Sequence, residues 1–557
     1  MDFLRSIEDY LVSAGAPEEN VRGEVVWSQE VKNGDCSFPC FKLSKVMRKS
    51  PVAIACELSQ KGNLPYFVAK TESVSGYLNF FFDRDAVAKE VLEECNNKGD
   101  TYAPKESNGK TICMDYSSVN IAKPFHIGHL LTTVIGGSLH KIYQYLGYKV
   151  VGINHIGDYG TQFGKLIVAY LKWGEGKPQT MDSLLELYVK FHKEAEKDES
   201  LNEEARQWFK KIENGDNQAT ELFAEMKRIT LEEVDKVYKR LNITFDSYNG
   251  EAFYNDKMQP VIDALKQKNL LVESDGAMVV NLDEYGMPPC LILKSDGATL
   301  YATRDLAAAL YRKNTYDFYK SLYVVAYQQT LHFKQIFKVL ELLGYEWAKD
   351  CVHVPFGMVS LEGVGAMSTR EGKVVKLKDV LNEAVEKTKT IISQKNPDLE
   401  NKDETAEAIG VGAVVFGALI NGRIKDIVFS IDKALNFDGE TGPYLQYTHA
   451  RCCSILSKGE IGEADYSMLT DDESFELIRL LSRYDDVVML AADRYEPSIL
   501  SRYLIDLAQA FNKFYIGHRV ICDDKKLQSS RLALTKAVKD ALCNGMKLIL
   551  LKAPEKM

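Results

Sequence analysis

The sequence predicts an α/β protein in which a parallel-sheet domain follows a small α/β module and precedes a bundle of helices. From residue 111 onward, short apolar segments alternate with long helical patterns, which is typical of βαβ units in a parallel sheet. The N-terminal part combines a helical pattern with a strand rich in aromatic residues. From about residue 437 to the end, only helical periodicity is found. These observations divide the chain into residues 1–105, 106–436 and 437–557.

The length agrees with several domains rather than one, because the chain has 557 residues and an ordinary domain has ~150. Apolar residues make up 45% and charged residues 27% of the chain, which excludes predominant disorder. The longest nearly unbroken apolar stretch, residues 408–420, is shorter than the ~20 residues that cross a bilayer. We therefore expect a folded protein without a membrane span.

The N-terminal module, residues 1–105, is expected to begin with a helix. Apolar side chains at helical spacing predict an amphipathic helix of the mature fold and not a signal or transit peptide; they are Leu4, Ile7 and Leu11. Residues 76–82 predict a strand. The polar stretch 96–110 contains Asn, Lys, Gly and Pro, and predicts a linker to the next domain.

The central domain, residues 106–436, is expected to hold the parallel sheet. Buried strands are predicted at residues 111–116, 149–153, 321–326 and 352–359. A long helix is predicted between the first two strands, starting from Pro124. Two insertions are expected, a charged helical one at about residues 172–239 and a hairpin-like one at residues 278–301. In the third domain, a regular apolar stripe predicts a bundle of helices: Leu500, Leu504, Leu507, Phe511 and Phe514.

Charge and cysteine content narrow the function classes. The net charge of −10 argues against a protein that coats nucleic acid through bulk positive charge, although a local basic face suffices for binding. The acidic excess also suits a cationic small substrate. The eleven cysteines show no CxxC spacing, so we expect free thiols in a reducing cytosol and no metal cluster.

The strongest local motif lies between the first strand and the long helix of the central domain. It runs Asn120-Ile-Ala-Lys123-Pro-Phe-His126-Ile-Gly128-His129. Amides at a helix N-terminus favour phosphate, and imidazoles three residues apart share a face of the first turn. They can donate to phosphate oxygens whose charge grows in a transition state, and Gly128 lets a base or ribose approach the backbone. The alternative is a helix start with two exposed histidines.

Three further motifs are weaker alone. Residues 363–373 combine glycines, hydroxyls and cations, which is typical of a mobile phosphate-binding loop but also of a surface hairpin. Residues 155–164 follow the second strand, where open α/β sheets bind ligands, although ordinary turn chemistry explains them equally. Carboxylates beside aromatics at residues 246–251 and 301–305 can hold a guanidinium, yet surface or capping roles are the simpler interpretation.

Together these motifs resemble the arginyl-tRNA synthetases of class I. Residues 126–129 are similar to the family's HIGH motif, and Met367-Ser368-Thr369-Arg370 is similar to its KMSKS-type loop. Residues 157–164, 301–308 and 437–451 resemble further family motifs in the family's order. HIGH alone is shared with other nucleotidyltransferases, whereas the ordered set, from about residue 75 to the end, is not.

The resemblance implies a ligase that activates L-arginine with ATP and transfers arginine to the 3′ end of tRNA-Arg, with a first step that depends on tRNA. It implies catalytic roles for Lys123, His126 and His129. It implies ATP contacts by His126, Gly128, His129, Met367, Ser368 and Lys373. The implied arginine-binding residues are Asn120, Glu251, Tyr301, Asp305 and Gln329. The implied tRNA-binding residues are Asn79, Phe82, Tyr515 and Met557.

The resemblance also implies what each domain does. Residues 1–105 would form an additional domain that contacts the tRNA elbow, and residues 437–557 a helical anticodon-binding domain. Residues 106–436 would form a Rossmann-like catalytic domain with insertions and the KMSKS-type loop. ATP is expected as its Mg²⁺ complex, without a structural metal. The family further implies a monomer, and we expect it in the cytoplasm.

Two departures from the family pattern keep other functions open. Ala366 stands where many class I enzymes have lysine, and either Lys123 or Lys373 is expected to supply the missing cation. Val119 replaces a frequent proline, with a small expected effect on the backbone. One alternative is a different adenylate-forming enzyme, which would not need tRNA. The other is a non-catalytic tRNA-binding relative, which the loss of lysine at position 366 favours.

Overall fold

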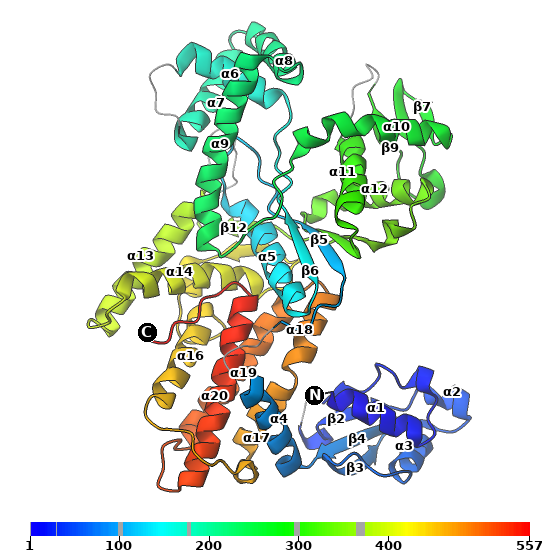
Figure 1. The fold of residues 1–557 in the computed structure, drawn as a ribbon, viewed down its shortest axis with the longest axis vertical. Helices are drawn as coiled ribbons and strands as arrows, with labels where there is room; N and C mark the ends of the chain where they lie inside the picture. Colours follow the sequence, from blue (N-terminus) through cyan, green and yellow to red (C-terminus); the bar gives the residue numbers. More distant parts are fainter. Residues whose placement is uncertain (1, 29–30, 99–103, 175–179, 295–300, 364–373) are drawn as a thin grey trace. The chain divides into compact units, whose positions relative to one another are not determined.

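The computed structural model describes residues 2–28, 31–98, 104–174, 180–294, 301–363 and 374–557. The chain forms two compact units. The first consists of Met1–Tyr102, Arg451–Asp485 and Asp506–Leu542. The second consists of Ala103–Ala450, Asp486–Ile505 and Cys543–Met557. Figure 1 traces the chain from the N-terminus in blue to the C-terminus in red.

The N-terminal part of the first unit is an antiparallel sheet with helices packed on it (Figure 1). Its strand order is β1-β2-β4-β3. The strands are β1 (Val26–Trp27), β2 (Cys36–Pro39), β3 (Val68–Val74) and β4 (Tyr77–Phe82). The helices beside it are α1 (Phe3–Ser13), α2 (Leu43–Met47) and α3 (Pro51–Ser59), whereas α4 (Arg84–Lys98) follows β4 and contacts α17 (Asp472–Ser482). The strand predicted at residues 76–82 is confirmed as β4.

Helix α1 confirms the predicted amphipathic N-terminal helix. Ile7 and Leu11 on its inner face are fully buried. The ring of Phe3 packs against that of Phe82 in β4, with a centroid distance of 5.4 Å. Burying this apolar face against the sheet supplies most of the stability of such a short helix.

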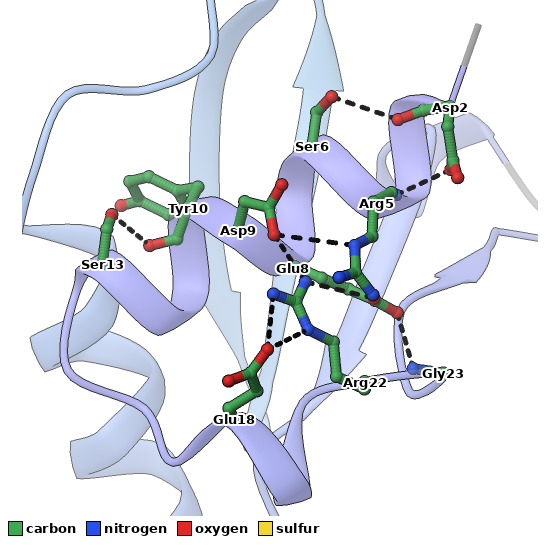
Figure 2. Close-up of polar contacts among 10 residues, drawn as sticks. All are labelled: Asp2, Arg5, Ser6, Glu8, Asp9, Tyr10, Ser13, Glu18, Arg22 and Gly23. Atoms are coloured by element: carbon green, nitrogen blue, oxygen red, sulfur yellow. Dashed lines mark hydrogen bonds and ion pairs between the residues drawn. The ribbon is translucent and has the colours of Figure 1, made fainter.

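The outer side of α1 is held by an ionic cluster around Arg22 (Figure 2). The guanidinium of Arg22 lies 2.6 Å from Asp9 and 2.9 Å from Glu18. The backbone N–H of Gly23 donates to Glu8 at 2.7 Å. These contacts fix the segment that follows α1 against the helix.

The second unit contains the predicted parallel sheet. Its strands are β5 (Thr111–Asp115), β6 (Lys149–Ile153), β10 (Lys320–Tyr323) and β11 (Cys351–His353). They lie in the order β11-β10-β5-β6, and every neighbouring pair is parallel. The chain therefore proceeds outward from β5 on one side and from β10 on the other. The strands predicted at residues 111–116, 149–153 and 321–326 are confirmed, with small shifts at their ends.

The single strand predicted at residues 352–359 is wrong, because the structure has two strands there. Strand β11 ends at His353, and β12 (Val359–Leu361) pairs instead with β13 (Ile427–Phe429). Pro355 lies between them and has no N–H for a sheet ladder. The N–H of Gly357 donates to Arg423 at 2.8 Å, which takes the chain out of the first sheet.

The remaining elements of this unit include both predicted insertions (Figure 1). The helices α5 to α9 are α5 (Leu130–Tyr145), α6 (Thr161–Trp173), α7 (Met181–Ala195), α8 (Ser200–Glu213) and α9 (Asn217–Arg240). The hairpin-like insertion is an antiparallel sheet of β7 (Leu271–Ser274), β8 (Ala277–Val280) and β9 (Cys290–Leu293). The other helices are α10 (Met258–Gln267), α11 (Tyr301–Tyr316), α12 (Thr330–Leu342), α13 (Leu377–Lys395), α14 (Lys402–Leu419) and α15 (Ile431–Ala434).

The C-terminal part is helical, as predicted. Its helices are α16 (Gly442–Leu456), α17 (Asp472–Ser482), α18 (Tyr484–Asp493), α19 (Ser498–Gly517) and α20 (Lys525–Leu548). The predicted stripe lies on α19, and all five of its side chains are fully buried. Across the described ranges, no helix combines the length and the apolar character that a membrane span requires.

Candidate active site

A cavity of about 450 Å³ opens at the carboxyl end of the parallel sheet. Asp115 at the end of β5 and Tyr323 at the end of β10 are register partners and line it. Because the connections leave these two strands toward opposite sides, the loops part here, as at other ligand sites of open α/β sheets. All five residues implied to bind arginine line this one cavity: Asn120, Glu251, Tyr301, Asp305 and Gln329.

Asn120 is held by the turn after β6. The N–H of Ile121 donates to the carbonyl of Gly157 at 3.1 Å, and the N–H of Gly157 donates to Val119 at 2.9 Å. A Cβ atom at position 157 would lie 2.3 Å from Oδ1 of Asn120. Only glycine therefore lets the Asn120 side chain lie where it does. The segment 155–164 has a positioning role that its turn-like composition did not reveal.

The same segment positions Glu251, which begins the short helix η4 (Glu251–Lys257). The N–H of Glu251 donates to the carbonyl of Ile156 at 3.0 Å. The next N–H, of Ala252, donates to the buried carboxylate of Asp158 at 2.9 Å. Burial raises the pKa of Glu251 to about 7, although the nearby charge of Arg304 lowers it. This carboxyl group is therefore protonated more easily than an ordinary glutamate, in spite of the positive charge of Arg304.

Arg304 brings a guanidinium of the protein itself to the cavity wall. Its Nη1 lies 3.3 Å from Oε2 of Glu251, and its guanidinium lies 4.2 Å from the ring centroid of Tyr159. The side chain is only 4% exposed, and its Nε is buried without a hydrogen-bond partner. No role was predicted for Arg304, although it directly precedes Asp305 in the sequence.

A second buried ion pair forms the floor of the cavity. Nη2 of Arg312 donates to the carboxylate of Asp115 at 2.7 Å, and both side chains are buried. Negative charge around Arg312 keeps its pKa well above the ordinary value, against the effect of burial. Neither residue was predicted from the sequence. Asp115 could have been found as an acid at the end of a strand, and Arg312 as an arginine on the α11 face that carries Asp305 and Ala308.

The histidines of the HIGH motif form a compact turn. His126 precedes the short helix η3 (Ile127–His129), and His129 is the last residue of this helix. Their ring centroids are 4.0 Å apart. Nδ1 of His126 accepts the N–H of Gly128 at 3.0 Å, and Nδ1 of His129 accepts the N–H of His126 at 3.2 Å. Because both Nδ1 atoms act as acceptors, the ring proton lies on Nε2 in both residues. Each imidazole thus carries one N–H donor that the turn itself does not use.

Burial keeps both imidazoles neutral. It lowers the pKa of His126 to about 4 and that of His129 to about 3. The charge of Lys123 lowers both values further, which places this ammonium group within electrostatic reach of the two rings. Neutral donors beside a cation can stabilise negative charge that develops on a phosphate.

Three of the predicted ATP contacts, Met367, Ser368 and Lys373, lie outside the described residues. The segments on both sides of residues 364–373 lie against the HIGH turn. Strand β12 precedes them and contacts η3. After them, the carbonyl of Val375 accepts the N–H of Ile127 at 3.0 Å. The described residues that flank the KMSKS-like motif therefore lie beside the HIGH turn.

The predicted tRNA contacts differ in exposure. Asn79 and Phe82 are both 6% exposed; Ser37 donates to Asn79, and the ring of Phe82 packs against Phe3 and Phe67. Both side chains are therefore largely shielded from solvent, and their contact with RNA stays a prediction. Tyr515 is 42% exposed on α19, and the terminal residue Met557 is partly exposed.

Comparison with known proteins agrees with this architecture along the whole chain. Residues 91–431 match the family described as tRNA synthetases class I (R), catalytic domain. Residues 2–82 match the arginyl tRNA synthetase N terminal domain, and residues 445–557 match the DALR anticodon binding domain.

Whole-chain relatives give the same result. The arginine–tRNA ligase of Halothermothrix orenii is 52% identical over 531 residues, and that of Clostridioides difficile is 53% identical over 534 residues. Each match covers 94% of this chain and 94% of the relative. The structure of the Thermus thermophilus arginyl-tRNA synthetase superposes with a TM-score of 0.82 at 26% identity, covering 100% of both chains. These matches cover the parallel sheet, the HIGH turn and the acidic cavity. The chain therefore belongs to the arginyl-tRNA synthetases, a family of class I aminoacyl-tRNA synthetases.

Proposed function

We propose that this chain activates L-arginine with ATP and then transfers the arginyl group to the 3′ end of tRNA-Arg. In the first step, the arginine carboxylate attacks the α-phosphorus of ATP, and the bond to pyrophosphate breaks. In the second step, a hydroxyl of the terminal ribose attacks the carbonyl carbon of arginyl-adenylate, and AMP leaves. We further propose that the first step depends on bound tRNA.

The convergence on one cavity of the five residues that the family resemblance implies supports this proposal most strongly. Asn120, Glu251, Tyr301, Asp305 and Gln329 come from distant parts of the sequence, yet all line the same space. A guanidinium is planar and permanently charged, and it can bind carboxylates through two parallel hydrogen bonds. Lysine lacks this fork, so the paired acids discriminate by geometry as well as by charge.

We assign the phosphates of ATP to the HIGH turn. In this proposal, the Nε2 donors of His126 and His129 stabilise the charge that grows on the transferring phosphate, and Gly128 admits the adenosine. Lys123 supplies the cation that the loop lacks at Ala366. Met367, Ser368 and Lys373 are proposed as further ATP contacts: these residues resemble the family's loop, and the segments flanking them lie against η3. Mg²⁺ would be held mainly by the phosphates and water.

The RNA contacts are proposed for three parts of the chain. Residues 1–105 would contact the tRNA elbow, residues 106–436 would hold the acceptor end, and residues 437–557 would bind the anticodon region. On β4, Phe82 remains a proposed RNA contact, and the exposed Tyr77 on the same strand offers a ring face for base stacking. Asn79 stays a proposed contact only through its backbone or the edge of its side chain. Tyr515 and Met557 remain proposed contacts of the C-terminal part.

We also propose that the protein acts as a cytoplasmic monomer without a structural metal. In the described part of the first unit, ligand atoms of Asp471, Glu473 and His518 lie within 4.8 Å of one another. Asp471 caps α17 by accepting from Ser474, and Glu473 lies 3.5 Å from Lys513. Helix capping and ion pairing account for this group without a cation.

Arginine-dependent exchange between ATP and pyrophosphate tests the function, with and without tRNA-Arg and with lysine and glutamate as control substrates. Exchange with arginine only in the presence of tRNA is the expected result. Exchange without tRNA would retain the ligase but remove the coupling. Absence of exchange in a protein that still binds tRNA would favour the non-catalytic relative.

The role of Lys123 is tested by Lys123→Ala, which should abolish exchange while arginine binding is retained. Lys123→Arg keeps the charge and should restore part of the rate. Near-normal exchange in Lys123→Ala, together with loss in Lys373→Ala, would transfer the role to Lys373.

A further inference from the structure

His332 contacts the predicted arginine ligand Asp305 inside the cavity. It is the third residue of α12, and its Nε2 lies 2.6 Å from Oδ2 of Asp305 in α11. The two side chains are 25% and 29% exposed, and both line the cavity. Nothing in the sequence analysis assigned a role to His332. It lies in the first turn of α12, three residues after Gln329. His126 and His129 of the HIGH motif are separated by the same spacing.

The charges that line the cavity nearly cancel. Asp115 is paired with Arg312 and Glu251 with Arg304, so two carboxylates are balanced by two guanidinium groups of the protein. Asp305 is the third carboxylate among the described lining residues, and its contact is an imidazole. With Glu251 ionised, as it is above its pKa of about 7, and with a neutral His332, the cavity has one surplus negative charge, which matches one guanidinium. With a protonated His332, the surplus disappears.

We propose that His332 is a positioning residue that orients Asp305 and, when protonated, competes with the substrate guanidinium for this carboxylate. The inference rests on the assignment of the cavity to arginine. A neutral imidazole donates one hydrogen bond to Asp305 and leaves the carboxylate's charge for the substrate. A protonated imidazole neutralises that charge, so arginine binding and protonation of His332 oppose each other. Arginine binding below neutral pH then releases a proton.

Several other ionisable groups surround this pair and must be separated from it in any test. Burial lowers the pKa of His155 and of His353, so both rings stay neutral near pH 7. Burial raises the pKa of Cys290 to about 12, which keeps this thiol neutral. The two arginines stay charged. Among the described neighbours, Glu251 has a pKa of about 7 and therefore titrates near neutral pH.

Calorimetric titration of the full-length protein with L-arginine, in the presence of tRNA-Arg and without ATP, measures this coupling. Between about pH 8 and about pH 6, the wild-type Kd should rise severalfold, because protons compete with the substrate guanidinium for the carboxylates of the cavity. Buffers of different ionisation enthalpy give the number of protons released. His332→Gln keeps an N–H donor near Asp305 without a titrating ring. It should retain most of the affinity at pH 8 and lose the part of the pH dependence and proton release that remains in Glu251→Gln.

Three variants make the outcomes distinguishable. If Glu251→Gln removes the pH dependence and His332→Gln retains it, the effect belongs to Glu251 and the inference is overturned. If Asp305→Asn binds arginine as tightly as the wild type, the cavity assignment itself fails. If Asp305→Asn weakens binding but His332→Gln leaves both Kd and proton release unchanged, only the role of His332 fails. His332→Asn replaces His332→Gln if the latter does not fold, and should give the same loss of proton release.

Discussion

The acidic cavity and the HIGH turn lie in the same unit, yet burial affects the charge of their side chains differently. In the turn, burial lowers the pKa values of His126 and His129 to about 4 and about 3, so two neutral donors remain. In the cavity, Arg312 keeps its charge beside Asp115, whereas Glu251 beside Arg304 has its pKa raised to about 7. Desolvation favours the neutral form in both places. In the turn, the two imidazoles take the neutral form. In the cavity, neighbouring guanidinium groups stabilise the charged form of the carboxylates.

This difference predicts different kinetic consequences. The turn can stabilise charge that exists only in the transition state, so changes there should lower kcat. The cavity binds a charge that the substrate already has, so changes there should raise the KM for arginine. Each prediction below tests one side of this comparison, beginning with the largest expected effect.

His126→Asn should reduce kcat by about 10²- to 10³-fold, the usual loss for one transition-state donor. Oδ1 of asparagine can still accept the N–H of Gly128, so the variant removes the Nε2 donor and keeps the turn. Steady-state aminoacylation checks this, with thermal unfolding as the control for folding. A large rise in the arginine KM at unchanged kcat would contradict the division between turn and cavity.

Glu251→Gln should raise the KM for arginine by about 30- to 150-fold, which corresponds to roughly 2–3 kcal/mol. The variant removes a charge that faces the substrate and leaves the buried Arg304 without its ionic partner. Glu341→Gln on α12 is the matched control, because its side chain is 63% exposed and pairs with Lys338. Equal losses in kcat and in kcat/KM would place Glu251 on the transition-state side.

Gly157→Ala should raise the KM for arginine about five- to thirtyfold, from an overpacking cost of roughly 1–2 kcal/mol. The new Cβ would lie 2.3 Å from Oδ1 of Asn120, so this side chain must leave its position. Gly422→Ala is the control, because no atom lies within 4 Å of its added Cβ. If the two variants behave alike, the contact with Asn120 does not shape the cavity.

The smallest expected effect concerns His140. It tests whether burial favours the neutral form of a side chain in this protein. Burial lowers the pKa of His140 to about 4, below the unfolded value near 6.5. Its contribution to stability is therefore complete above about pH 6.5 and is lost as the pH falls toward about 4, because the unfolded chain binds the proton first. Between pH 7.5 and pH 5.5, His140→Asn should show a smaller fall in Tm than the wild type. An equal or larger fall would show that this ring is not held neutral.

Periodic and local patterns predicted much of the fold correctly. The helix α1, the strand β4 and the parallel strands β5, β6 and β10 were found because buried faces repeat with a fixed period in the sequence. The prediction failed at residues 352–359, where an apolar run contains Pro355 and divides between two sheets. Apolar runs do not carry information about which sheet they join.

The candidate site was predicted in part. Motif order gave Asn120, Glu251, Asp305 and the HIGH histidines, whereas Arg304, Arg312 and His332 received no role. Each of these three side chains contacts a partner that is distant in sequence or lies in another element. The amino-acid sequence alone does not show such contacts. For Phe82, the matching position in the sequence did not reveal that its ring is buried against Phe3 and Phe67.

The sequence by itself determined the family, the succession of α/β module, parallel sheet and helices, and the types of side chain that serve the reaction. Only the tertiary structure decided the charge state of those side chains. Whether an imidazole is neutral or a carboxylate is paired depends on how much water reaches it and which charges lie within a few ångströms. These quantities arise when the loops after β5, β6 and β10 meet at one edge of the sheet.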